Sequence, residues 1–469
     1  MDRRKHKPQS NVFAPLVAGI VVALLAACTP PKSPPDTLAK TETEITTSQL
    51  DAFFDVLEEQ DRWRGSVALM VDGEPIYQRT LAAHETGSGE GESAPVYRIG
   101  SITKSVTAAL VMQQIQMGTL SLTSTVDQWF PDILHAETIT IEQLLTHTSG
   151  LENFTDRQEY LTVHTQPMGR ADKVELLESL KSDFEPGSAF KYSNSGYLLL
   201  GLILEDVSGK SLPQLLQSQI AEPLKLHHTT FGGEPDTRET APSGNLASYV
   251  WQGNWQPAPA TDLSVPGAAG AVLSTPQDVS RFFRALVQGK IVDADDSLPK
   301  MLPASAAYGF GLMKFPYGKH SGYGHTGGLD GFSSMAGYFP DQDIAFAVLS
   351  NGSRFNNNDI AIALLATAYG DPVTIPQFGS AADTSAAAAR IADFIGHYTS
   401  EQMPLALDMF IEEDQLYGQA TGQGKFPLSP VDKDTFEFAP AGLRIAFFQD
   451  GLTLYQAGAE YQFSRQPEN

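Results

Sequence analysis

The sequence predicts an α+β protein in two parts, a large domain of mixed helices and strands followed by a small all-β domain. Two observations lead to this fold class. Helical patterns alternate with short apolar runs over residues 49–375, and within them the β-prone runs 333–339 and 344–350 flank the turn-rich Pro340–Asp343, which is typical of an antiparallel hairpin. Beyond residue 390, short β-prone runs follow one another between Gly, Pro and Asp.

The N-terminus has the layout of a signal peptide. Basic residues precede the apolar run 12–27, and the only cysteine, Cys28, follows it. The run is shorter than the ~20 residues that span a bilayer, so we expect it to be removed. Leu25–Cys28 resembles the lipobox of bacterial lipoproteins, which implies that Cys28 carries lipid and anchors the protein to a membrane of the cell envelope, facing outside the cytoplasm.

The rest of the chain divides by composition. A signal peptide at 1–27 leads into a Pro/Thr-rich tether at 28–48 and a large domain at 49–375. Small and polar residues at 376–389 predict a linker, although Ala386–Ala389 would also suit a short helix. The final part, 390–469, is expected to be a small antiparallel barrel or sandwich without catalytic residues. Its predicted strands are 405–411, 415–420, 443–448, 452–456 and 461–464.

Composition excludes several classes of function. With 42% hydrophobic and 18% charged residues the chain is globular, and a net charge of -24 without a basic cluster beyond the N-terminal tip argues against a nucleic-acid partner. His227 and His228 are adjacent, so their side chains diverge, and no third metal ligand is indicated. We therefore expect no metal and no organic cofactor. The signatures of α/β-hydrolases, zinc peptidases and phosphate-binding loops are absent from the sequence.

Ser101 and Lys104 form the first candidate for catalysis. They open an apolar stretch with helical spacing that ends at Gly118. Residues three apart on a helix are neighbours, so the Lys104 amine can reach the Ser101 hydroxyl. A serine at a helix start also lies near unpaired backbone N–H groups, which favour a developing anion; the alternative is a simple helix cap.

Two other segments share the Ser-x-x-Lys spacing, Ser188–Lys191 and Ser297–Lys300. The first follows Pro186-Gly187 in a loop. In the second, Pro299 is expected to oppose a regular helix. Only Ser101 begins an apolar helix, so it is the predicted nucleophile.

Two further motifs follow in the chain. Tyr192-Ser193-Asn194 precedes an apolar helix predicted over 197–207, and His325-Thr326-Gly327-Gly328 lies just before the hairpin. Together with Ser101–Lys104, and in this order, they resemble the penicillin-recognising serine hydrolases, in particular the class C β-lactamase-like branch with its D-alanyl-D-alanine carboxypeptidases, D-aminopeptidases and esterases. Flanking segments support the resemblance: Tyr97–Gly100, Leu144–Leu151, Gly267–Gly270 and Ser274–Pro276.

The resemblance covers about residues 49–374 and implies a serine β-lactamase/penicillin-binding-protein-like fold, an antiparallel sheet flanked by helices plus a helical region. It further implies a lipocalin-like C-terminal domain. In the implied mechanism Ser101 is acylated, and Lys104 and Tyr192 together act as the base. The resemblance leaves open which of the two takes the first proton. Asn194 would orient the lysine or a substrate amide, and His325, Thr326, Gly327 and Gly328 would bind substrate, with the N–H groups of Ser101 and Gly328 as the oxyanion hole.

Free Lys and Tyr titrate near pH 10, so a base at neutral pH requires a pKa shift of about three units. We expect a nearby ammonium to favour the phenolate, with both groups titrating as a coupled pair. His325 stands where class C β-lactamases usually carry lysine, which argues against a dedicated β-lactamase. A Ser-His-Asp triad through His325 and Asp330 is the competing scheme, ranked lower because nothing in the strand context orients the imidazole.

The sequence therefore predicts a serine hydrolase that acts through an acyl-enzyme on D-amino-acid peptides, amides or esters. Three alternatives stay open: a true β-lactamase, a penicillin-binding sensor without turnover, and a structural envelope protein. The expected partners are a small peptide, amide, ester or β-lactam substrate and, through Cys28, a membrane.

Overall fold

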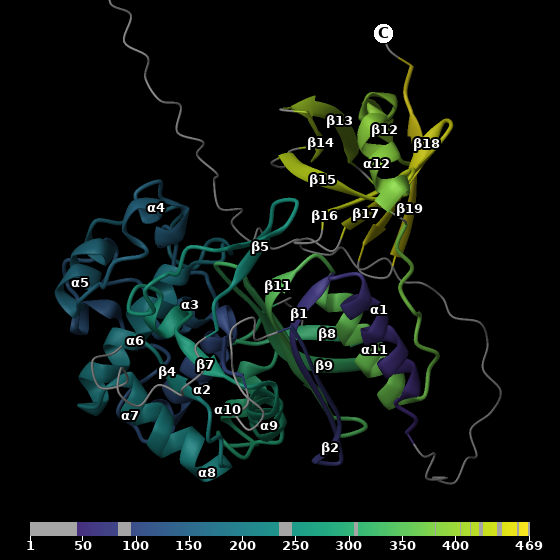
Figure 1. The fold of residues 1–469 in the computed structure, drawn as a ribbon. Coiled ribbons are helices and arrows are strands. Elements are labelled where there is room, and N and C mark those ends of the chain that lie inside the picture. Colours follow the sequence, from purple (N-terminus) through teal and green to yellow (C-terminus); the bar gives the residue numbers. More distant parts are fainter. Residues whose placement is uncertain are drawn as a thin grey trace, which may run out of the picture.

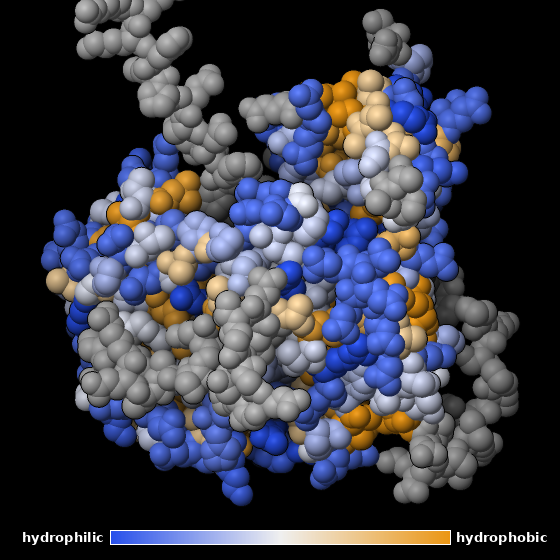
Figure 2. Space-filling view, viewed as in Figure 1, coloured by the Kyte–Doolittle hydropathy of each residue, from blue (hydrophilic) through white to orange (hydrophobic). Residues whose placement is uncertain are grey.

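A computed structural model of the chain describes residues 45–82, 95–233, 246–303, 308–379, 381–403, 405–412, 414–421, 425–438, 443–456 and 459–467. The predicted signal peptide, Cys28 and most of the tether lie outside the described residues. Among the helices of the described segments, none is long and apolar enough to cross a membrane. On the face shown in Figure 2, hydrophilic side chains predominate and apolar ones lie in small separate groups.

A six-stranded sheet forms the centre of the large domain. Its strand order is β2-β1-β11-β10-β9-β8, and every neighbouring pair is antiparallel. The predicted hairpin is confirmed, with β10 and β11 paired from Ser333 and Ser350 to Phe339 and Ile344. The strands are β1 (Trp63–Val71), β2 (Glu74–Leu81), β8 (Met313–Tyr317), β9 (His320–Leu329), β10 (Phe332–Phe339) and β11 (Ile344–Ser353).

Helices cover both faces of this sheet, as the class α+β predicts (Figure 1). On one face lie α1 (Ser48–Glu59) and α11 (Asn357–Tyr369), which share an apolar core with alternate residues of β1 and β11. On the other face α9 (Pro276–Val287) packs against β1, β10 and β11. Because both faces are covered, β1 and β11 are buried along almost their whole length, which explains their continuous apolar sequences.

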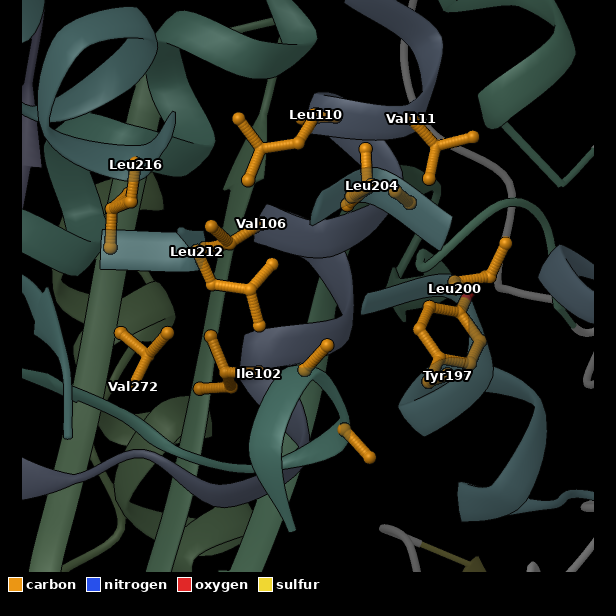
Figure 3. Close-up of a cluster of buried hydrophobic side chains, with 14 of the residues drawn as sticks. Ile102, Val106, Leu110, Val111, Tyr197, Leu200, Leu204, Leu212, Leu216 and Val272 are labelled. Carbon is orange, nitrogen blue, oxygen red and sulfur yellow. The ribbon is translucent and has the colours of Figure 1, made fainter. Parts of the chain in front are cut away.

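A helical region beside the sheet is built around α2 (Thr103–Gln116) and α6 (Asn194–Ser208). Both helices are apolar on most sides and are therefore buried. Figure 3 shows their side chains in one cluster with Leu212, Leu216 and Val272. The remaining elements of this domain are the helices α3 (Ile141–Leu145), α4 (Tyr160–Val163), α5 (Arg170–Glu178), α7 (Leu212–Leu216), α8 (Glu222–Leu224) and α10 (Ser297–Met301), the 3-10 turns η1 (Gly100–Ile102), η2 (Val126–Gln128), η3 (Phe154–Asp156) and η6 (Gly267–Ala269), the π-turn η4 (Gln217–Ala221), and the strands β3 (Tyr97–Arg98), β4 (Thr230–Phe231), β5 (Tyr249–Trp251), β6 (Trp255–Pro257) and β7 (Val272–Ser274).

The expectation that Pro299 prevents a helix at 297–300 is wrong. The short helix α10 forms there, because proline in the first turn of a helix removes no hydrogen bond. Lys300 nevertheless pairs with Asp296 at 2.6 Å and not with Ser297, which is buried. This Ser-x-x-Lys segment therefore has no serine–lysine contact.

The C-terminal part is a closed antiparallel barrel of strands β12 to β19, and a core of aromatic and aliphatic side chains fills it. Part of the segment predicted as a linker forms the helix α12 (Ala381–Ala389), as the alternative interpretation of its alanines had it, and Ala387 is buried in the barrel core.

Three strands of the barrel, β12, β15 and β16, were not predicted from the sequence. Pro427 and Pro430 lie within β15 and hide its strand pattern. The strands are β12 (Gly396–Thr399), β13 (Ala406–Glu412), β14 (Gln415–Ala420), β15 (Lys425–Asp432), β16 (Thr435–Phe438), β17 (Leu443–Phe448), β18 (Gly451–Gln456) and β19 (Ala459–Arg465), after the 3-10 turn η7 (Ile391–Phe394).

A buried charged pair joins the barrel to the large domain. The Arg62 guanidinium lies 3.6 Å from the Glu437 carboxylate of β16 and stacks on the Phe378 ring, 4.3 Å from its centroid. The Gly379 N–H donates to the Val431 carbonyl of β15 at 3.0 Å. The two domains are thus joined by the contact between Arg62 and Glu437 and by a backbone hydrogen bond.

Candidate active site

Ser101 lies in the tight turn between β3 and α2. It belongs to the 3-10 turn η1, and the N-cap residues of η1 and α2 are Ile99 and Ile102, so Ser101 is not a plain helix cap. Gly100, just before it, has a φ of +52°, which favours glycine. A Cβ at Gly100 would lie 2.8 Å from the Gly328 nitrogen, so only glycine lets the serine turn and β9 approach this closely.

The edge of β9 faces this turn. β8 pairs with β9 only over His320–Gly324, which leaves the following residues of that edge unpaired by β8. Leu329 and Phe332 pair across a two-residue turn and form a hydrogen-bonded pair, so the next pair, Gly328 with Ser333, is a non-hydrogen-bonded one. The Gly328 N–H therefore points away from β10.

On the other side of that edge lies the backbone of the serine turn. A Cβ at Gly327 would lie 2.9 Å from the Ser101 nitrogen and 2.1 Å from the Ile99 carbonyl oxygen. The N–H groups of Ser101 and Gly328 thus belong to two backbone segments in direct contact. This is the arrangement that an oxyanion hole requires.

The Lys104 side chain is completely buried, and its amine has three neighbours. It donates to the Asn194 Oδ1 at 2.7 Å and to the Ala269 carbonyl at 2.8 Å, and it lies 3.0 Å from the Ser101 Oγ. Burial lowers the pKa of Lys104 well below 10.5, which favours the neutral amine. A carbonyl and an amide oxygen can only accept, so in the neutral form they would take the two protons of the amine and leave its lone pair for the serine hydroxyl. Lys104 is therefore placed as a base for Ser101.

Tyr192 completes this group. Its hydroxyl interacts with the Ser101 side chain, and its ring centroid lies 4.9 Å from the Lys104 nitrogen. Burial raises the pKa of Tyr192 above its usual value, so the phenol keeps its proton. The expectation that a lysine ammonium stabilises a phenolate is thus not met, because burial favours the neutral form of both groups. Tyr192 is suited to pass on a proton rather than to take the first one.

Asn194 is the first residue of α6 and orients the lysine. While its Oδ1 accepts from Lys104, its Nδ2 donates to Thr155 at 3.0 Å and its N–H donates to the Asn153 Oδ1 at 2.9 Å. Asn153 in turn donates to Thr155 at 2.8 Å and is buried. Neither Asn153 nor Thr155 was predicted from the sequence; the run Leu144–Leu151 ends just before them and is the only signal that could have pointed to them.

His325 is buried and has both ring nitrogens engaged. Its Nδ1 lies 2.5 Å from the Thr326 carbonyl, and its Nε2 lies 3.0 Å from the Tyr308 hydroxyl. Burial lowers the pKa of His325 to about 3, so the ring is neutral. Neither nitrogen is free to hold a substrate carboxylate, whereas Thr326 and Gly328 are exposed along the edge of β9. Tyr308, in the segment Tyr-Gly-Phe-Gly, was not predicted from the sequence to belong to the site.

The competing Ser-His-Asp triad does not form. Asp330 accepts hydrogen bonds from the Thr261 N–H and hydroxyl at 3.0 and 2.6 Å and pairs with Arg98 at 3.4 Å. The His325 Nδ1 faces a backbone carbonyl instead of this carboxylate. The described residues also hold no group of three or more His, Cys, Asp or Glu that could bind a metal ion.

The geometry brings together the parts of a serine acyl-transfer site: a candidate nucleophile, a buried amine with a lowered pKa, a phenol and the backbone N–H groups of two segments in contact. Comparison with known proteins agrees. The family model described as Beta-lactamase matches residues 50–369, and the chain belongs to this family of serine hydrolases.

Two relatives are distant in sequence, but the alignment with this chain covers most of the length of each. The chain is 26% identical to the D-alanyl-D-alanine-carboxypeptidase/endopeptidase AmpH of Escherichia coli, over 72% of this chain and 93% of the relative. It is 28% identical to Penicillin-binding protein 4 of Amycolatopsis lactamdurans, over 64% and 84%.

Solved structures give the same answer. D-amino acid amidase from Ochrobactrum anthropi superposes with a TM-score of 0.55 at 28% identity, covering 65% of this chain and 93% of the amidase. The octameric penicillin-binding protein homologue from Pyrococcus abyssi covers 89% of this chain and 99% of its own, with a TM-score of 0.58 at 22% identity, and shows the fold alone.

Proposed function

We propose that this protein hydrolyses D-amino-acid amides, peptides or esters through an acyl-enzyme on Ser101. The observation that carries the proposal is the triple contact of the buried Lys104 amine with Ser101, Asn194 and the Ala269 carbonyl. The similarity to a D-amino acid amidase and to a D-alanyl-D-alanine carboxypeptidase supports the substrate class.

In acylation, the Ser101 oxygen attacks the substrate carbonyl carbon while its proton passes to the Lys104 nitrogen. The resulting ammonium has three hydrogens and three oxygen neighbours in place, so it is stabilised without rearrangement. The N–H groups of Ser101 and Gly328 hold the oxyanion, a contribution of ~3 kcal/mol per donor. When the bond to the leaving group breaks, Tyr192 donates its proton to the departing nitrogen or oxygen and regains one from Lys104. Water then reverses these steps and frees Ser101.

A substrate panel with purified residues 29–469 tests this function. The panel holds a D-amino-acid amide, a D-alanyl-D-alanine peptide, a short-chain ester and a cephalosporin, each with a Ser101→Ala control. We expect the unmodified chain, but not Ser101→Ala, to turn over the amide, the peptide or the ester many times. Turnover only of the cephalosporin indicates a β-lactamase, stable labelling without turnover indicates a sensor, and turnover that survives in the control excludes Ser101.

We further propose that Cys28 is lipidated and holds the enzyme in the cell envelope. The support is sequence alone, the basic start, the apolar run 12–27 and the segment Leu25–Cys28. The full-length chain expressed in a bacterium should fractionate with membranes, and Cys28→Ser should release it from them. An unchanged membrane fraction in that variant contradicts the proposal.

A further inference from the structure

A buried histidine outside the motifs that define the site holds the loop of Tyr192. Residues 183–193 form no helix or strand, so the loop does not fix Tyr192 by its own backbone pairing. His147, in the turn after α3, supplies two hydrogen bonds instead. Its carbonyl accepts the Lys191 N–H at 3.0 Å, and its Nδ1 accepts the Ser193 N–H at 3.2 Å. The residues on both sides of Tyr192 are therefore fastened to one histidine.

The imidazole also packs on the catalytic tyrosine. Its centroid lies 4.2 Å from that of the Tyr192 ring and 4.7 and 5.1 Å from those of Tyr308 and Tyr197. His147 is 2% exposed and has a φ of +59°, a conformation in which histidine, asparagine and aspartate are enriched among residues other than glycine. Both the backbone and the ring of His147 therefore fix the place of the phenol.

The hydrogen bonds determine the protonation state of this ring. Because Nδ1 accepts, the neutral ring carries its proton on Nε2, and that atom is buried without a hydrogen-bond partner among the described residues. An unpaired buried N–H is unfavourable, because it loses its hydrogen bond to water without gaining another. Packing alone is served better by an apolar side chain, so the Nδ1 acceptor is the property that distinguishes histidine here.

We propose that His147 is a positioning residue for Tyr192: by accepting the Ser193 N–H through Nδ1 it keeps the phenol hydroxyl at Ser101. The inference rests on the proposed function, because it assigns Tyr192 to proton transfer. His147 itself transfers no proton. Burial lowers its pKa well below 6.5, which keeps it neutral.

Two variants of the full chain separate the acceptor from the ring. His147→Phe keeps an aromatic ring and removes the acceptor, whereas His147→Asn suits the left-handed backbone and offers Oδ1 near the place of Nδ1. Misplacement by about 1 Å costs ~100-fold, so His147→Phe should lower the rate of Ser101 labelling by a fluorophosphonate and kcat ~10- to 100-fold, with KM nearly unchanged. His147→Asn should stay within ~5-fold of the unmodified chain.

A double-mutant cycle with Tyr192→Phe shows whether His147 acts through the tyrosine. His147→Phe should have almost no further effect in that background, with thermal unfolding measured for every variant. An undiminished effect there, a normal labelling rate in folded His147→Phe, or a ~100-fold loss in folded His147→Asn overturns the assignment. Labelling requires no turnover, so a protein that is labelled but hydrolyses nothing in the panel refutes the proposed function and leaves this test intact.

Discussion

Replacing Lys104 by methionine perturbs the site at the point where the structure is most specific. Methionine fills a similar volume without an amine, so the Ser101 hydroxyl loses the nitrogen that lies 3.0 Å from it. The Asn194 and Ala269 oxygens lose their donors as well. We expect the backbone around Ser101 to keep its position in this variant.

The contacts of Lys104 determine how far the substitution changes the reaction rate and the free energy of unfolding. Loss of a positioned base lowers the rate ~100- to 10,000-fold, which corresponds to ~3 to 5 kcal/mol in the activation barrier. Two buried acceptors without donors cost ~1–3 kcal/mol each, but the variant no longer buries an amine, so these terms oppose one another in the free energy of unfolding. We expect a folded protein with nearly normal thermal stability and a very slow nucleophile.

The assay is the rate at which a fluorophosphonate labels Ser101, followed across pH. In the unmodified chain, the rate rises with pH as Lys104 loses its proton, and this step lies well below pH 10.5 because burial lowers the pKa of Lys104. Lys104→Met should show no such step. Lys300→Met is the matched control, because it has the same Ser-x-x-Lys spacing but an exposed lysine paired with Asp296, and it should label normally. A Lys104→Met rate within ~3-fold of the unmodified chain refutes the role of Lys104 as base.

Three further predictions follow. Gly327→Ala places a Cβ 2.1 Å from the Ile99 carbonyl and should lower kcat ~100-fold, whereas Gly328→Ala meets nothing nearer than 3.9 Å and should fold and retain more activity; equal losses contradict the proposed fit of β9. Asn153→Ala removes the acceptor of the Asn194 N–H and should lower the free energy of unfolding by ~1–3 kcal/mol and slow labelling, as denaturant titration and the probe would show; unchanged stability and labelling count against this support. Burial raises the pKa of Glu437 from 4.5 to about 7, so its stabilising contribution is full below pH 4.5 and is lost as pH rises through 7; thermal unfolding should therefore depend less on pH in Glu437→Gln, and an unchanged dependence speaks against this shift.

The sequence was sufficient wherever the signal is local. The spacing of Ser101 and Lys104, the hairpin around Pro340–Asp343 and the five predicted strands of the barrel each depend on neighbours in the chain, and each is found in the structure. The same local rules failed at Pro299, where proline occupies the first turn of a helix.

Contacts between distant residues could not be predicted in this way. The Ala269 carbonyl, Asn153 and Tyr308 reach the site from separate loops, and no period or spacing connects them to Ser101. The shift of Lys104 toward the neutral amine depends on how completely these loops bury it, which is a property of the folded core. Sequence therefore identifies the reacting groups, and packing determines their protonation.

The most direct measurement is the mass of the acyl-enzyme. The chain is mixed with a D-amino-acid ester or a fluorescent penicillin, quenched in acid during turnover, digested and mapped by mass spectrometry. We expect one acyl group on the peptide that contains Ser101, formed slowly in Lys104→Met and absent in Ser101→Ala. An adduct on another residue, or hydrolysis that persists in Ser101→Ala, contradicts it.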